Sequence, residues 1–163
     1  MRKRLLIFLI GFIPTALTCA SQTSSFEVVM QHYEPIRLAL IEDSTEGVAQ
    51  HGEAIASELK ALQENFTVSR VGASNEAASV VKEKLPGMII SAQALAQAES
   101  LETVRSAFYE LSKPMVRWRE GVAQEGLPSV AYCSMHKKSW LQPGQQIGNP
   151  YGGMPRCGQI VSK

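Results

Sequence analysis

The sequence predicts an all-α protein: a four-helix antiparallel bundle, followed by an irregular Cys/Met-rich C-terminal segment with room for a short two-stranded ribbon. Two observations lead to this fold class. Between residues 26 and 120, apolar residues recur every three or four positions in four stretches, which is typical of helices with one buried face. From residue 121 this period is lost, and residues 121–163 hold seven of the twelve glycines and four of the eight prolines.

The four predicted helices cover residues 26–41, 45–65, 74–98 and 101–119. Each has a narrow apolar face opposite a polar one, and four such faces are buried most economically against one another. Gly52 lies on the apolar face of the second helix, where it should let a neighbouring helix approach closely. The predicted core is made of large apolar side chains: Tyr33, Leu40, Leu59, Leu62, Phe108 and Leu111.

The sequence also predicts where the helices start and where they are interrupted. Residues 43–46 (DSTE) resemble a capping box for the second helix, and Ser74 and Ser100 are the expected N-caps of the third and fourth. Residues 67–72 are expected to be a simple connection. Pro35 predicts a kink or a late start of the first helix, and Pro86 predicts that the third is bent or split.

Residues 1–20 have the layout of a secretory signal peptide. Positions 2–4 are basic, and the apolar run at residues 5–13 is too short to span a bilayer. Small residues before Ser21 favour cleavage at that point. Lipidation of Cys19 ranks second, and an uncleaved membrane anchor ranks third. We therefore expect a periplasmic or secreted protein with no transmembrane span after processing.

Residues 21–163 are expected to form a single helical domain, with the bundle at 26–120 and the tail at 121–163. After processing, 13 Lys and Arg face 15 Asp and Glu, which gives a net charge of −2. No basic patch or stripe remains, which argues against nucleic-acid binding. A chain of about 140 residues is long enough to bury a core of its own.

The tail gathers sulfur donors in two short motifs. C-x-M-H contains Cys133, Met135 and His136, and M-x-x-C contains Met154 and Cys157. Thiolate and thioether sulfurs are soft ligands that select Cu(I), whereas Zn(II) has little use for methionine. If the two motifs converge, these residues complete a three- or four-coordinate metal site, with His136 in reserve.

A disulfide is an equally weighted interpretation of the two cysteines, because an oxidising compartment favours pairing. A Cys133–Cys157 bond would close a loop of about two dozen residues and stabilise the fold by about 3 kcal/mol. The methionines would then be ordinary gap-fillers. The two states can also alternate, with the reduced form binding metal.

Further motifs in the tail extend this pattern: Trp140-Leu141, Asn149-Pro150-Tyr151 and the glycine after Cys157. With the sulfur motifs, they resemble the signature of an uncharacterised bacterial periplasmic domain, found alone or at the C-terminus of adaptor proteins of copper/silver efflux pumps. The resemblance continues loosely over residues 33–43 and 105–112. Two departures are Ser134, where the family usually has proline, and a segment between Tyr151 and Met154 that is about two residues short.

The resemblance implies a metal-resistance setting and an efflux-system or other envelope protein as partner. The expected function is therefore soft-metal binding or metal-efflux assistance in the periplasm. The alternative is a disulfide-stapled envelope interaction module that binds a protein and no metal. Four tail residues are expected to be structural anchors: Trp140, Asn149, Pro150 and Tyr151.

Catalysis is not expected. The sequence offers no paired carboxylates, phosphate-binding loop or Ser/His/Asp arrangement, and a thiol and imidazole as close as Cys133 and His136 rarely orient correctly for nucleophilic attack. His32 and His51 are expected to be solvated or core-edge residues, because neither has a second donor four residues further on. We expect a binding protein and no catalytic residue.

Overall fold

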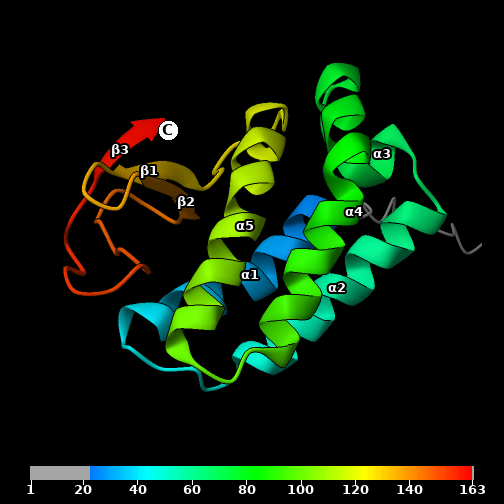
Figure 1. The fold of residues 1–163 in the computed structure, drawn as a ribbon. Helices are drawn as coiled ribbons and strands as arrows, with labels where there is room; N and C mark the ends of the chain where they lie inside the picture. The colour runs from blue at the N-terminus through cyan, green and yellow to red at the C-terminus, as the bar shows by residue number, and fades with distance from the viewer. Residues whose placement is uncertain (1–22, 163) are drawn as a thin grey trace, which may run out of the picture.

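The computed structural model describes residues 23–162, so the predicted signal peptide at 1–20 lies outside the described residues. The described chain is mostly helical, with a small antiparallel sheet near the C-terminus (Figure 1). The helices are α1 (Ser25–Ile41), α2 (Val48–Glu64), α3 (Val68–Val71), α4 (Asn75–Gln97) and α5 (Leu101–Glu120). The strands are β1 (Ser129–Cys133), β2 (Lys138–Gln142) and β3 (Gln159–Ser162).

The long helices pack in chain order, α1 against α2, α2 against α4 and α4 against α5 (Figure 1). Gly52 lies where α2 packs on α4. A Cβ atom on Gly52 would lie 2.8 Å from the backbone nitrogen of Ala96 and 2.9 Å from Cβ of Leu95. The expectation that Gly52 admits a neighbouring helix is therefore confirmed.

The core lies between these helices and continues under the sheet. All six predicted core residues are fully buried, which confirms the assignment of the apolar faces. Trp118, near the C-terminal end of α5, is buried beside α3, where its indole nitrogen donates to the carbonyl oxygen of Val71 at 3.0 Å. Phe26 meets this indole edge-on, with 5.5 Å between ring centroids.

Two of the three predicted helix starts are confirmed. Ser74 and Ser100 are N-caps whose side chains accept from the backbone nitrogens of Ala77 and Thr103. The capping box at residues 43–46 is wrong. Asp43 adopts a left-handed φ of 53° in the turn that ends α1, and its carboxylate pairs with Arg105 of α5, so α2 begins only after Gly47.

The prolines interrupt less than predicted. α1 starts at Ser25, well before Pro35, and α4 is one continuous helix through Pro86. Burial of the apolar neighbours Leu85 and Met88 offsets the backbone hydrogen bond that Pro86 removes. The expected connection at residues 67–72 contains one helical turn, α3, which Thr67 caps and Gly72 ends.

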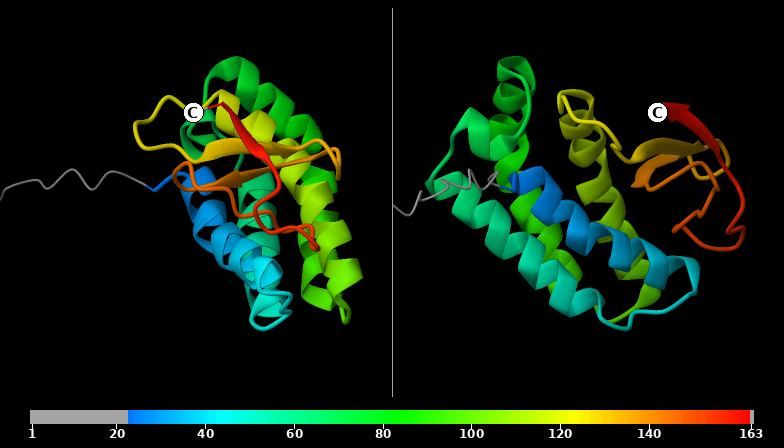
Figure 2. Two further views of the ribbon diagram at one scale, coloured as in Figure 1. Left: turned by 90° about the vertical axis from the view of Figure 1, so that its left-hand side faces the viewer. Right: turned by 180° about the vertical axis from the view of Figure 1, so that it is seen from behind.

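The sheet has the order β2-β1-β3, with both pairings antiparallel. The short ribbon predicted for the C-terminal segment forms between β1 and β3, where Ala131 lies opposite Ile160. β2 was not predicted. Figure 2 shows the sheet lying against α1 and α5, and the backbone nitrogen of Leu141 in β2 donates to the Tyr33 hydroxyl of α1 at 3.2 Å. Within residues 23–162 no helix is both long and apolar enough to cross a membrane.

Candidate functional site

Two arginines from the helices hold the loop that leads into the second sulfur motif. Arg37 of α1 is buried and donates to the carbonyl oxygen of Gly148 at 2.8 Å, while Glu34 accepts from the rest of its guanidinium. Arg105 of α5 donates to the carbonyl oxygen of Pro150 at 3.0 Å. The helices therefore fix the position of the tail.

Aromatic packing holds the tail from the other side. Trp140 and Tyr151 are buried and meet edge-on, with their ring centroids 5.9 Å apart. The Tyr151 hydroxyl donates to the carbonyl oxygen of Ser139 at 3.0 Å, and burial raises the pKa of this phenol. These contacts hold the loop around Tyr151 against β2.

Cys133 and Cys157 lie next to each other. Cys133 is the last residue of β1 and Cys157 comes two residues before β3, so the pairing of these strands brings them together. Cys133 is fully buried and Cys157 is half-buried. Both thiols are free, and each lies close enough to the other to shift its pKa. The two sulfur motifs therefore converge.

The turn after β1 directs backbone donors at the Cys133 sulfur. Lys137 closes this turn with a left-handed φ of 53°, and the N–H groups of Met135 and His136 face the sulfur. Successive N–H groups in such a turn form a concavity that stabilises a negative charge. Burial raises the pKa of Cys133, but donation from the Cys157 thiol and these N–H groups lowers it overall. Donation to Cys133 in turn raises the pKa of Cys157.

Asn149 joins the two motifs. Its side chain is buried and its Nδ2 donates to the carbonyl oxygen of Cys157 at 2.9 Å, while its Oδ1 accepts from the backbone nitrogen of Tyr151 at 2.9 Å. The Asn149 side chain also lies close enough to Cys133 to lower the pKa of that thiol. One residue therefore orients both cysteines.

The remaining predicted donors surround this pair less closely. Met135 and Met154 are 68% and 39% exposed, on the two turns that carry the cysteines. His136 is half-buried, and its Nε2 atom is buried without a hydrogen-bond partner. Across residues 23–162 no three His, Cys, Asp or Glu side chains gather closely enough to hold a metal ion, so His136 does not complete a three-residue cluster with the cysteines.

Comparison with protein families decides the classification of the chain. The model of DUF3347, described as a protein of unknown function, matches residues 29–125. The chain belongs to the DUF3347 family. Searches of curated proteins and of solved structures found no match.

The DUF3347 match covers the helices and stops before β1 begins at Ser129. The sulfur motifs therefore lie outside the matched region, while three residues that hold the tail lie within it. Tyr33, Arg37 and Arg105 contact Leu141, Gly148 and Pro150, respectively. The family match therefore includes the surface of the helices on which the tail rests.

One pairing was missed by sequence reasoning. His32 of the DUF3347 domain approaches His51, with 3.1 Å between their Nδ1 atoms. Burial and the neighbouring His51 lower the pKa of His32. The test for a donor four residues away finds only pairs on one helix, whereas these histidines come from α1 and α2. Only the register between the two helices could have revealed them.

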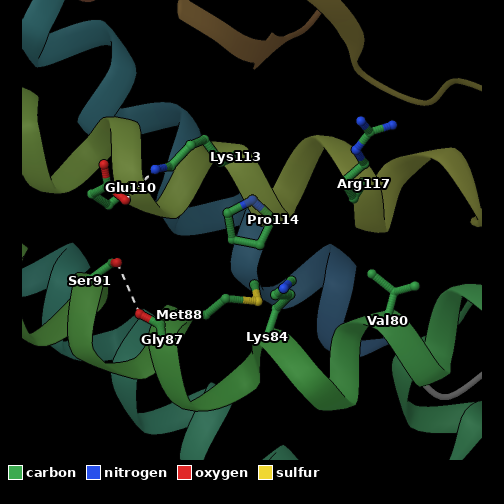
Figure 3. Close-up of a pocket in the computed structure, with 9 residues that line it drawn as sticks. All are labelled: Val80, Lys84, Gly87, Met88, Ser91, Glu110, Lys113, Pro114 and Arg117. Atoms are coloured by element: carbon green, nitrogen blue, oxygen red, sulfur yellow. Dashed lines mark hydrogen bonds and ion pairs between the residues drawn. The ribbon is translucent and has the colours of Figure 1, made fainter.

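A groove of about 420 Å³ lies between α4 and α5 (Figure 3). Its lining includes three cations, Lys84, Lys113 and Arg117. Each of them forms an ion pair with a glutamate on its own helix, at 2.7, 2.5 and 3.2 Å, respectively. Because these charges are already compensated, the groove offers less specific chemistry than the cysteine pair.

Proposed function

We propose that this DUF3347 protein binds a thiophilic metal ion outside the cytoplasm, with Cu(I) as the candidate and Cys133 and Cys157 as its principal ligands. The contact between the two thiols is the observation that carries the proposal. Metals bind the thiolate form, and hydrogen bonds to the Cys133 sulfur lower the pKa of that thiol. The lowered pKa of Cys133 therefore favours the thiolate form that a soft cation binds.

The methionines support the choice of copper. A gap-filling methionine is expected in the core, but Met135 and Met154 are exposed and fill no core gap. Their three rotatable bonds allow the thioether sulfurs to turn toward the cysteines. Two thiolates with thioether partners form a donor set suited to Cu(I). The unpartnered Nε2 of His136 remains a reserve donor.

The same donor set disfavours zinc. Structural zinc sites use four ligands drawn from cysteine, histidine and carboxylate side chains. Around the cysteines, the described part of the chain supplies no third side chain of these types in a metal-binding cluster. A site with two thiolates favours a cation that accepts low coordination and sulfur ligands.

The proposed setting is the periplasm, with handover of the ion to or from an efflux-system or other envelope protein. This part rests on the signal-like residues 1–20 and on the resemblance of the tail to domains of copper/silver efflux adaptors. The exposed Met135 gives such a partner a sulfur atom at the surface. The proposed role is binding and transfer, not catalysis.

Titration of the fully reduced protein with Cu(I), in competition with a chromophoric chelator and without oxygen, tests the metal site. We expect one tightly bound Cu(I) per chain. Cys133→Ser should weaken binding by about 100-fold or more, because it removes a principal ligand. Ser134→Ala changes an exposed neighbour and is the matched control. Absence of Cu(I) binding, or equal binding by Cys133→Ser, would refute the proposal.

A disulfide-stapled module that binds an envelope protein is the second candidate, because the same thiol contact favours it. The bond would stabilise the fold by about 3 kcal/mol in the loop-entropy model. Titration of free thiols in protein taken from the periplasm, with and without copper in the medium, separates the two candidates. Metal binding predicts two titratable thiols after copper is removed, whereas the staple predicts none before reduction.

A further inference from the structure

The closest contact between imidazole rings in the described chain joins two helices. His32 of α1 and His51 of α2 place their Nδ1 atoms 3.1 Å apart, with ring centroids separated by 5.3 Å. Both side chains are half-buried. The pair therefore lies where the helices meet and is still reachable from solvent.

The contact requires a particular arrangement of protons. One Nδ1 atom donates, so the other must present its lone pair. When the donating ring carries its proton on Nε2 instead, both rings stay neutral and both Nδ1 atoms present lone pairs to the same small space. Neutral imidazole is the commonest metal ligand among side chains.

We propose that His32 and His51 form a second metal site, for a borderline divalent cation such as Zn(II), which takes the place of the shared proton. Zinc–nitrogen bonds are about 2.0–2.1 Å long, so nitrogens 3.1 Å apart subtend an angle of about 100° at the ion. This angle is close to the tetrahedral value. The Nδ1–Nδ1 separation therefore already fits two ligands of one zinc ion.

The site differs from the cysteine site in its donors. Its two protein ligands are nitrogens, and no third His, Cys, Asp or Glu joins them in a cluster within residues 23–162, so water completes the coordination. Nitrogen donors with water suit zinc and similar cations rather than Cu(I). A bound ion would link α1 to α2 and stabilise their packing by mass action. The inference does not depend on the proposed Cu(I) site.

The test uses Zn(II) as the probe on the full mature chain labelled with nitrogen-15. Spectra that correlate imidazole protons with ring nitrogens report each histidine separately. We expect the Nδ1 resonances of His32 and His51 to shift together and to saturate at one Zn(II). His32→Gln and His51→Gln should each weaken this binding at least about tenfold. Gln50→Ala, at an exposed position beside His51, is the matched control and should leave the pair unchanged.

Two results would overturn the inference. Zn(II) that shifts only His136 would assign the ion to the tail, and unchanged affinity in His32→Gln would show that the pair is not a ligand. Glutamine is similar in size to histidine, and both positions are half-buried, so the variants should fold. Circular dichroism of each variant, compared with the parent protein, checks that the helices are retained. If one variant unfolds, the shifts in the parent protein still decide the question.

Discussion

Asn149 provides the sharpest test of how the tail is organised. Replacing Asn149 by alanine removes the donor to the Cys157 carbonyl oxygen and the acceptor for the Tyr151 backbone nitrogen, each at 2.9 Å. It also removes the amide that contacts the Cys133 sulfur. The substitution therefore acts on the orientation of both cysteines while leaving every sulfur atom in place.

The expected loss of stability follows from burial. A buried polar group left without a partner costs about 1–3 kcal/mol. Tyr151 is buried, so loss of the acceptor for its backbone nitrogen should cost near the top of this range. Cys157 is half-buried, so loss of the donor to its carbonyl oxygen should cost near the bottom. Together they predict that Asn149→Ala lowers the free energy of unfolding by about 2–4 kcal/mol.

Urea unfolding of the reduced protein, followed by tryptophan fluorescence, measures this change. Gln145→Ala is the matched control, because it removes an exposed amide from the same loop. In Asn149→Ala the pKa of Cys133 should also rise, since one donor to its sulfur is lost. A loss below about 0.5 kcal/mol, the range of neutral surface changes, would refute the role assigned to Asn149.

Three further predictions concern the helices and export. Gly52→Ala should lower the free energy of unfolding by about 1–3 kcal/mol, because the added Cβ would lie 2.8 Å from the backbone nitrogen of Ala96. Gly87→Ala is the control: a Cβ there would have no atom within 4 Å, so this variant should raise the free energy of unfolding by about 0.5–1 kcal/mol. Equal effects in urea unfolding would contradict the close packing of α2 on α4. Tyr33→Phe should lower the free energy of unfolding by about 1–3 kcal/mol, because the backbone nitrogen of the buried Leu141 loses its hydrogen-bond acceptor. Tyr109→Phe, which removes a hydroxyl from a half-buried tyrosine, is the control. Sequencing of the exported protein should begin at Ser21, and a lipid-modified Cys19 would contradict the proposed cleavage.

Local patterns predicted the helices well because helix formation depends on near neighbours. Three-and-four spacing gave the bounds of α1, α4 and α5 within one residue, and the serine caps followed from their side-chain chemistry. The start of α2 was predicted early because the pairing of Asp43 with Arg105 is a tertiary contact. No local pattern contains that ion pair.

Long-range contacts account for what was missed. β2 forms on β1, and the Trp140 indole donates to Gln142 at 2.9 Å, yet residues 138–142 show no strand alternation. The convergence of Cys133 and Cys157 depends on the pairing of β1 with β3, which no local pattern determines. The donors to the Cys133 sulfur and the His32–His51 contact depend on turn geometry and on helix register, which composition does not reveal.

The most direct test of the soft-metal account is the Cu(I) affinity of a variant in which Met135 and Met154 are both leucine. Leucine keeps nearly the same volume, and both positions are exposed, so stability to urea should not change. Met88→Leu, at a buried position on α4, is the matched control. The account predicts that Cu(I) affinity falls by about 10- to 100-fold in the double variant and is unchanged in the control. Parent-like Cu(I) affinity in the double variant would contradict thioether ligation, and with it the assignment of these two motifs to a mixed thiolate–thioether copper site.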